Sequence, residues 1–154
     1  MRPFCLDTDV FIDATKLYPR DVFSRLWQTL EAWARGGRII APEEVLRELQ
    51  KVDDDTSEWA REHAHLFRPP DERVQQALAS ILKRLPELVR ADDPTPAADA
   101  WVVAQAKADD AVVVTKENPA RGPGARPKIP DVCREFGVGC VKLLDLLREM
   151  DLGY

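Results

Sequence analysis

Cysteine and histidine are scarce in this sequence, and neither residue type forms a recognisable set of metal ligands. Cys5, Cys133 and Cys140 are odd in number and scattered, with no Cys-x-x-Cys pair, which argues against a disulfide framework or a zinc knuckle. His63 and His65 are two positions apart, so on a helix they point to different sides and do not share a metal. Free thiols suit a reducing compartment, and we therefore expect a cytoplasmic protein.

Long apolar runs and an excess of basic residues are also missing. No apolar stretch approaches the roughly 20 residues that a membrane-spanning helix needs, and we expect no membrane partner. Only Arg2 precedes the first short apolar run, which does not predict a secretory signal. The formal net charge of −5 argues against a protein that coats nucleic acid through bulk electrostatics. It does not exclude a nuclease, because the carboxylates of a metal site contribute negative charge that the metal offsets.

Length and composition predict a single domain over residues 1–154. A chain of 154 residues is large enough to bury a core of its own. Its 45% of hydrophobic and 32% of charged residues are ordinary for a folded protein, so the composition does not indicate disorder.

Short apolar segments alternate with amphipathic segments along the chain. The apolar segments predict strands at residues 4–6, 38–41, 111–115 and 138–141. Apolar residues at helical spacing predict helices that include residues 22–33, 45–49, 74–85, 99–106 and 143–150, with a connector at residues 13–19. Pro42 is expected in the first turn of one helix, and Thr95 and Pro96 at the start of another. This alternation implies an α/β fold, in which helices cover both faces of a central parallel sheet.

Acidic residues recur where the predicted strands end and the predicted helices begin. Asp7 follows the first strand, Glu48 lies on the helix after the second, Asp99 begins an otherwise apolar helix face, and Glu117 follows residues 111–115. The carboxyl ends of parallel strands face the ligand crevice of such a fold. Carboxylate oxygens suit Mg²⁺ or Mn²⁺, and such an ion can polarise a phosphoryl group and generate hydroxide near neutral pH. The plainer interpretation is that Asp7 and Asp9 cap the next helical turn.

The order of these segments resembles the PIN-domain family over essentially the whole chain. Residues 6–10, Leu-Asp-Thr-Asp-Val, resemble its opening Leu-Asp-Thr-Asn/Ser-Val, with Asp9 in place of the usual amide or hydroxyl. Residues 45–49 are similar to its Glu-Leu segment, with Glu48 as the acid, and residues 98–106 to its Asp-Ala-x-x-x-Ala-x-Ala helix. Residues 113–117 resemble its Val-Thr-x-Asp strand end, with Glu117 where aspartate is more usual.

The resemblance implies a three-layer α/β/α PIN-like fold with about four or five strands, which binds Mg²⁺ or Mn²⁺ and hydrolyses RNA. The acids that match its motifs would hold the ion and carry the catalysis: Asp7, Glu48, Asp99 and Glu117. Thr115 could orient a water or a carboxylate, since its hydroxyl both donates and accepts, and Glu44 competes with Glu48 on the same helix face. Many small members are VapC-like toxins that an antitoxin inhibits and that dimerise. We therefore expect an RNA substrate, an antitoxin partner and a homodimer.

Two other functions remain open at this stage. Asp7 and Asp9 also fit the Asp-x-Asp opening of haloacid-dehalogenase-like phosphatases, as a covalent nucleophile and a general acid. That family places its later acid pair after a strand, whereas Asp109 and Asp110 precede one. A non-catalytic binding module on a PIN scaffold is the second alternative, because a fold alone does not establish activity.

The loop after Glu117 is predicted to contact the substrate. Residues 118–130 hold four prolines and two glycines, which indicates a loop rather than a helix or a strand. Exposed basic loops are often only solvated linkers, but this one leaves a strand end that is assigned to the metal. Its cations could therefore reach the phosphates of RNA: Lys116, Arg121, Arg126 and Lys128.

Overall fold

The computed structural model describes residues 1–52, 54–89, 92 and 97–153, in which strands and helices alternate. The strands are β1 (Phe4–Leu6), β2 (Ile39–Pro42), β3 (Phe67–Arg68), β4 (Val112–Val114) and β5 (Cys140–Val141). The helices are α1 (Thr8–Leu17), α2 (Ser24–Arg35), α3 (Glu43–Val52), α4 (Asp54–Glu62), α5 (Glu72–Arg84), α6 (Ala98–Ala108), α7 (Ile129–Phe136) and α8 (Leu143–Met150). Two short 3₁₀ helices follow α4 and α5: η1 (Ala64–Leu66) and η2 (Pro86–Leu88). No helix of the described segments is long and apolar enough to cross a bilayer.

The five strands form one parallel sheet in the order β3-β2-β1-β4-β5, which confirms the predicted α/β fold. In its register Cys5 of β1 is paired with Ile40 of β2 on one side and with Val113 of β4 on the other. From β1 the chain continues outward to β2 and β3, and it then returns to add β4 and β5 on the opposite side. The order therefore reverses between β1 and β4, and a crevice that suits a ligand forms at the carboxyl ends of these two strands.

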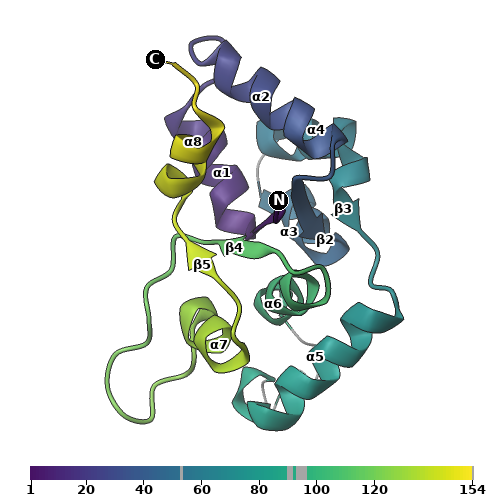
Figure 1. Cartoon of the computed structure of the whole chain (residues 1–154), viewed down its shortest axis with the longest axis vertical. Helices are drawn as coiled ribbons and strands as arrows, with labels where there is room; N and C mark the ends of the chain where they lie inside the picture. The colour runs from purple at the N-terminus through teal and green to yellow at the C-terminus, as the bar shows by residue number, and fades with distance from the viewer. Residues whose placement is uncertain (53, 90–91, 93–96, 154) are drawn as a thin grey trace.

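Helices cover both faces of the sheet and complete three layers (Figure 1). In this view α1, α2 and α8 lie on one side of the sheet, and α5, α6 and α7 lie on the other. α6 packs against β1, β2 and β4 and also against α5, and most of its residues are buried. A helix that leads into a parallel strand begins at the carboxyl edge of the sheet. Asp99, in the first turn of α6, therefore lies at the same edge as Asp7.

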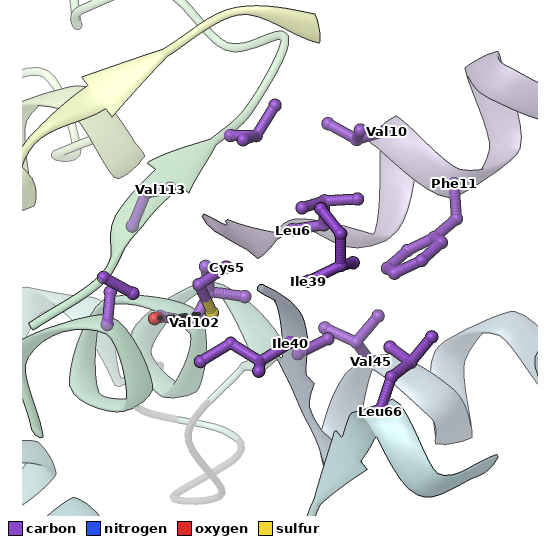
Figure 2. Packing of buried hydrophobic residues seen from close by; sticks show 14 of the residues in the cluster. Cys5, Leu6, Val10, Phe11, Ile39, Ile40, Val45, Leu66, Val102 and Val113 are labelled. Atoms are coloured by element: carbon purple, nitrogen blue, oxygen red, sulfur yellow. Dashed lines mark hydrogen bonds between the residues drawn. The ribbon is translucent and has the colours of Figure 1, made fainter. Parts of the chain in front are cut away.

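β1 has only three residues, and its side chains are apolar because they pack into the core on both faces of the sheet. Its side chains alternate between the two faces, so Cys5 points toward Val102 of α6 whereas Leu6 points toward Val10 of α1 (Figure 2). Cys5 is fully buried, and its thiol donates to the carbonyl oxygen of Val102 at 3.6 Å. Burial raises the pKa of this thiol far above its ordinary value, which makes it a packing residue and not a nucleophile.

Some local predictions were wrong, and each error has an identifiable cause. Residues 13–17 continue α1 instead of forming a connector, since Ala14 is buried and the helix ends just before Pro19. Pro42 closes β2 and does not belong to the first turn of α3. β3 was not predicted, because two residues carry no detectable alternation. The predicted helix start at Thr95 and Pro96 lies outside the described residues.

Candidate active site

Asp7 is buried at the carboxyl end of β1, with only 4% of its surface exposed, and its carboxylate is held at both oxygens. Its Oδ1 accepts from the backbone N–H of Thr8 at 2.7 Å, which caps the start of α1. Its Oδ2 accepts from the Thr115 hydroxyl at 3.1 Å, across the point where the strand order reverses. The capping interpretation therefore holds for Asp7, and Thr115 contacts the same carboxylate.

Glu48 is linked to the segment of Asp7 through Thr8, the residue that follows Asp7 in the first motif. The hydroxyl of Thr8 donates to Glu48 Oε1 at 2.5 Å, so α3 is fastened to the start of α1. These side chains line a cleft of about 300 Å³, which also includes Asp9, Asp99 and Lys51. Glu44 does not line this cleft, since its Oε1 pairs with Arg47 at 3.1 Å. The two glutamates share a helical face in sequence, but the packing of α1 on α3 brings only Glu48 to Thr8.

The acids of this edge influence one another electrostatically. Burial raises the pKa of Asp7 to about 7, the charge of Asp99 adds to the increase, and the hydrogen bonds from Thr115 and Thr8 oppose it. Asp99 keeps exposed surface at the cleft, yet the protein around it desolvates its carboxylate and raises its pKa to about 6. The charges of Glu117, Glu48 and Asp9 add to that increase. The predicted acids therefore share one electrostatic environment.

Glu117 is positioned by contacts from three segments. Its backbone N–H donates to the Thr115 hydroxyl at 3.1 Å, and its Oε2 accepts from the N–H of Ile129 at 3.1 Å, at the first residue of α7. A helix N-terminus favours a carboxylate there. The ammonium group of Lys142 donates to the carbonyl oxygen of Glu117, and also to the Lys116 carbonyl and the Asn118 side chain, both at 3.1 Å. Lys142 thus fixes the turn that carries Glu117.

The basic residues predicted for RNA occupy different environments. Lys116 lies 3.8 Å from Asp13, so part of its charge is offset within the protein. Arg126 donates to the carbonyl oxygen of Leu88 at 2.8 Å, and Lys128 immediately precedes α7. Arg121 is exposed on the loop.

Sequence reasoning missed three side chains of this region: Thr8, Lys51 and Lys142. Lys51 lies three residues after Glu48, so helical spacing could have placed both on one face. Thr8 stands between the two aspartates of the first motif, where a hydroxyl is a plausible hydrogen-bond donor. Lys142 had no local signal, because its acceptors are more than twenty residues away in sequence.

The donor set of the cleft fits a hard divalent cation. Carboxylate oxygens are the ligands that Mg²⁺ and Mn²⁺ prefer, and the cleft brings together Asp7, Asp9, Glu48 and Asp99. Among the described residues, no three aspartate, glutamate, histidine or cysteine side chains already converge on one point. The donor types of the cleft therefore suit such an ion, whereas the described carboxylates are not gathered around one point.

Comparison with known proteins supports the architecture. A sequence model of the family described as "Domain of unknown function (DUF4411)" matches residues 4–154. No curated protein sequence matches the chain. The solved structure of FitAcB from Neisseria gonorrhoeae is similar at 18% identity and a TM-score of 0.50, over 90% of this chain and 96% of that chain. VapBC2 from Rickettsia felis, bound to a DNA fragment from their promoter, is similar at 16% identity and a TM-score of 0.54, over 90% of this chain and 97% of that chain. The likeness confirms the predicted PIN-like three-layer fold.

Proposed function

The chain belongs to the DUF4411 family and has a PIN-like fold, and from that fold and its acidic cleft we propose that it is a metal-dependent ribonuclease. The observation that carries the proposal is the acidic cleft at the strand reversal between β1 and β4. A buried carboxylate whose pKa is raised to about 7 is costly for a fold unless a bound cation or a reaction makes use of it.

Asp7, Glu48 and Asp99 of the cleft would hold Mg²⁺ or Mn²⁺ in this proposal, together with Glu117, which does not line the cleft but is close enough for its charge to act on Asp99. The bound ion would polarise the scissile phosphodiester and activate a water for attack. The chain's own contribution is to hold its ligands in place before the substrate arrives. Thr115 and Thr8 restrict the Asp7 carboxylate, and the Thr8 hydroxyl restricts Glu48.

The raised pKa values connect ion binding to proton release. Near neutral pH the carboxyl groups of Asp7 and Asp99 are partly protonated in the metal-free protein, because their pKa values are about 7 and about 6. A cation displaces these protons when it binds. Asp99, which keeps exposed surface in the cleft, is the one of the two that exchanges its proton directly with solvent.

The substrate would run along the basic loop that follows β4. Lys128 is close enough to Asp99 for its charge to act on that carboxyl, and Lys116, Arg121 and Arg126 lie on the same loop. Such contacts attract the phosphates of any RNA sequence and contribute affinity without selectivity.

We also propose that the protein is the toxin of a toxin–antitoxin pair, which an antitoxin protein inhibits, and that it forms a homodimer. The likeness in fold to FitAcB and to VapBC2 supports the pair, and the homodimer rests on the resemblance of the sequence motifs alone. Co-purification of the chain with the product of an adjacent reading frame, followed by loss of ribonuclease activity in that complex, tests the pair. Sedimentation of the isolated chain tests the homodimer.

The phosphatase alternative loses its support in the structure. Asp109 and Asp110 come just before β4, at the amino edge of the sheet, whereas Asp7 lies at the carboxyl edge. Asp109 is also engaged there by Arg73 at 2.8 Å. The second acid pair that such a phosphatase requires is therefore remote from Asp7.

The deciding experiment is Mn²⁺-dependent cleavage of a pool of RNAs by the wild type, Asp7→Asn and Asp99→Asn. Asp110→Asn is the matched control, because it makes the same chemical change at the opposite edge of the sheet. We expect cleavage by the wild type and the control, and none by the two cleft variants. A wild type that neither binds Mn²⁺ near millimolar concentration in calorimetry nor cuts RNA would identify the non-catalytic module instead.

A further inference from the structure

A second cavity lies beside the acidic cleft and shares Asp99 with it. Its volume is about 300 Å³, at the lower end of the range for small-ligand pockets. The start of α6, the end of η2, the last residues of the basic loop and the start of α7 form its walls. Glu117 lines it as well, so two of the four proposed metal ligands border this cavity.

The inner surface of the cavity is apolar. Leu88, Ala100, Ile129 and Val132 contribute to it, and all four are buried residues of the folded core. These side chains have no polar atoms that could replace the hydration shell of an ion. They suit a flat group with an apolar face, which gains free energy when it leaves water.

Two positively charged side chains line the same cavity. Arg126 spans it from the loop to η2, because its guanidinium donates to the Leu88 carbonyl at 2.8 Å. A guanidinium has five N–H donors in one plane, so the plane and the other donors remain available to a ligand. Lys128 is close enough to Asp99 for its positive charge to lower the pKa of that carboxyl, against the other influences. An apolar floor with cations beside it matches a nucleobase that is joined to phosphates.

We propose that this cavity binds one unpaired nucleobase of a single-stranded RNA, with the guanidinium of Arg126 against the base and Lys128 on the adjoining phosphate. A base within a duplex is stacked and paired, so only a single strand, a loop or a bulge can present one to the cavity. The guanidinium plane of Arg126 stacks on the base. Because Asp99 borders both the cavity and the acidic cleft, a base in the cavity brings its own phosphodiester next to that cleft. The inference rests on the proposed ribonuclease function and adds to it one subsite, the cavity that receives a single base of the RNA.

Two variants change the cavity without altering the buried core. Ala97 lines the cavity, is exposed, and makes no side-chain cap to α6, so Ala97→Leu fills the space at little cost in stability. Arg126→Gln removes the charge and the stacking plane. Arg121→Gln is the matched control, because Arg121 is exposed on the same loop and does not line the cavity.

The test measures fluorescence anisotropy of labelled six-nucleotide RNAs at one fixed salt concentration, with every variant built on Asp7→Asn to prevent cleavage. The ligands are the four homopolymers, a duplex, and the free nucleoside monophosphates as competitors. We expect Ala97→Leu and Arg126→Gln to weaken single-strand binding by roughly tenfold, within the range for loss of one stacked base. Preference among the four homopolymers should also disappear. Arg121→Gln should cause a smaller loss that is equal for all four.

The proposal and the proposed function can fail separately. Unchanged single-strand affinity and preference in both cavity variants, or a duplex bound as tightly as the single strand, would overturn the cavity assignment. Monophosphates that compete as well as RNA would overturn it too, in favour of a small nucleotide ligand. The Mn²⁺ affinity of Ala97→Leu on the wild-type background should equal that of the wild type. Absence of RNA cleavage by the wild type overturns the ribonuclease function alone, while cavity-dependent binding would still stand.

Discussion

Replacing Asp7 by asparagine should stabilise the metal-free protein at neutral and alkaline pH. The pKa of Asp7 is about 7 in the folded protein, against an ordinary value of 3.8. Each tenfold difference in proton affinity is worth about 1.4 kcal/mol, so ionised Asp7 destabilises the fold by about 4 kcal/mol above pH 8. Asparagine carries no charge at any of these pH values and avoids this cost.

The hydrogen bonds at the site reduce the expected gain only slightly. The amide oxygen of asparagine can accept from the Thr8 N–H as the carboxylate does. Its NH₂ group can donate to the Thr115 hydroxyl, which reverses the present bond. Allowing about 1 kcal/mol for the weaker neutral bonds, we expect a net gain of about 3 kcal/mol at pH 8. For a protein of this size that is a rise in melting temperature of roughly 10 °C.

The pH dependence of stability gives the sharper test, because its sign is determined by the direction in which the pKa of Asp7 is shifted. The folded state binds the Asp7 proton more tightly than the unfolded chain does, so wild-type stability falls as pH rises from about 4 to about 7. The advantage of Asp7→Asn should therefore be absent at pH 4, grow through this window and level off above it. Urea unfolding followed by circular dichroism, with EDTA present, measures the difference at each pH.

Asp110→Asn serves again as the control and should show no such trend, since Asp110 is exposed. Saturating Mn²⁺ should cancel the advantage, because the ion stabilises only a protein that can bind it. Lower stability of Asp7→Asn at pH 8, or a difference from the wild type that is the same at all pH values, would refute the reasoning. Either result would mean that the protein already compensates the charge of Asp7 without a metal.

Three further predictions concern metal affinity. Glu48→Gln should weaken Mn²⁺ binding by roughly tenfold or more, whereas Glu44→Gln should change it little, because only Glu48 contacts Thr8; the opposite order in calorimetry would exclude Glu48. Lys142→Met should also weaken Mn²⁺ binding by roughly tenfold, because it removes the contacts that hold the turn with Glu117, and Lys142→Arg should restore part of that affinity. Equal Mn²⁺ affinities of Lys142→Met and the wild type would show that Lys142 is only a surface residue. The apparent affinity of the wild type should rise between pH 5.5 and 8, with proton release visible in buffers of different ionisation enthalpy, and a flat profile would contradict the raised pKa values.

Local patterns in the sequence were sufficient to predict the α/β class and most of its elements. Runs such as residues 111–115 are apolar and too short for a helix, and a buried parallel strand is the element that uses such a run. The end of α1 could also have been predicted from the sequence, because Pro19 marks the end of a helix. Residues 13–19 were instead predicted to be a connector. Asp7 and Glu117 were found from their position after strands, and Asp99 from its position at the start of a helix that leads into a strand, because chain direction alone places such positions at one edge of the sheet.

Only the tertiary structure decided which of these side chains meet. Asp7 and Thr115 are 108 residues apart, and their hydrogen bond exists because β4 is inserted beside β1, which no local pattern encodes. The choice between Glu44 and Glu48 depended on how α3 packs against α1, since both residues share a helical face. The pKa of Asp7 likewise depends on burial and on Asp99, and both arise from packing between distant segments. Residue types can be read along the chain, but distances and desolvation belong to the folded molecule.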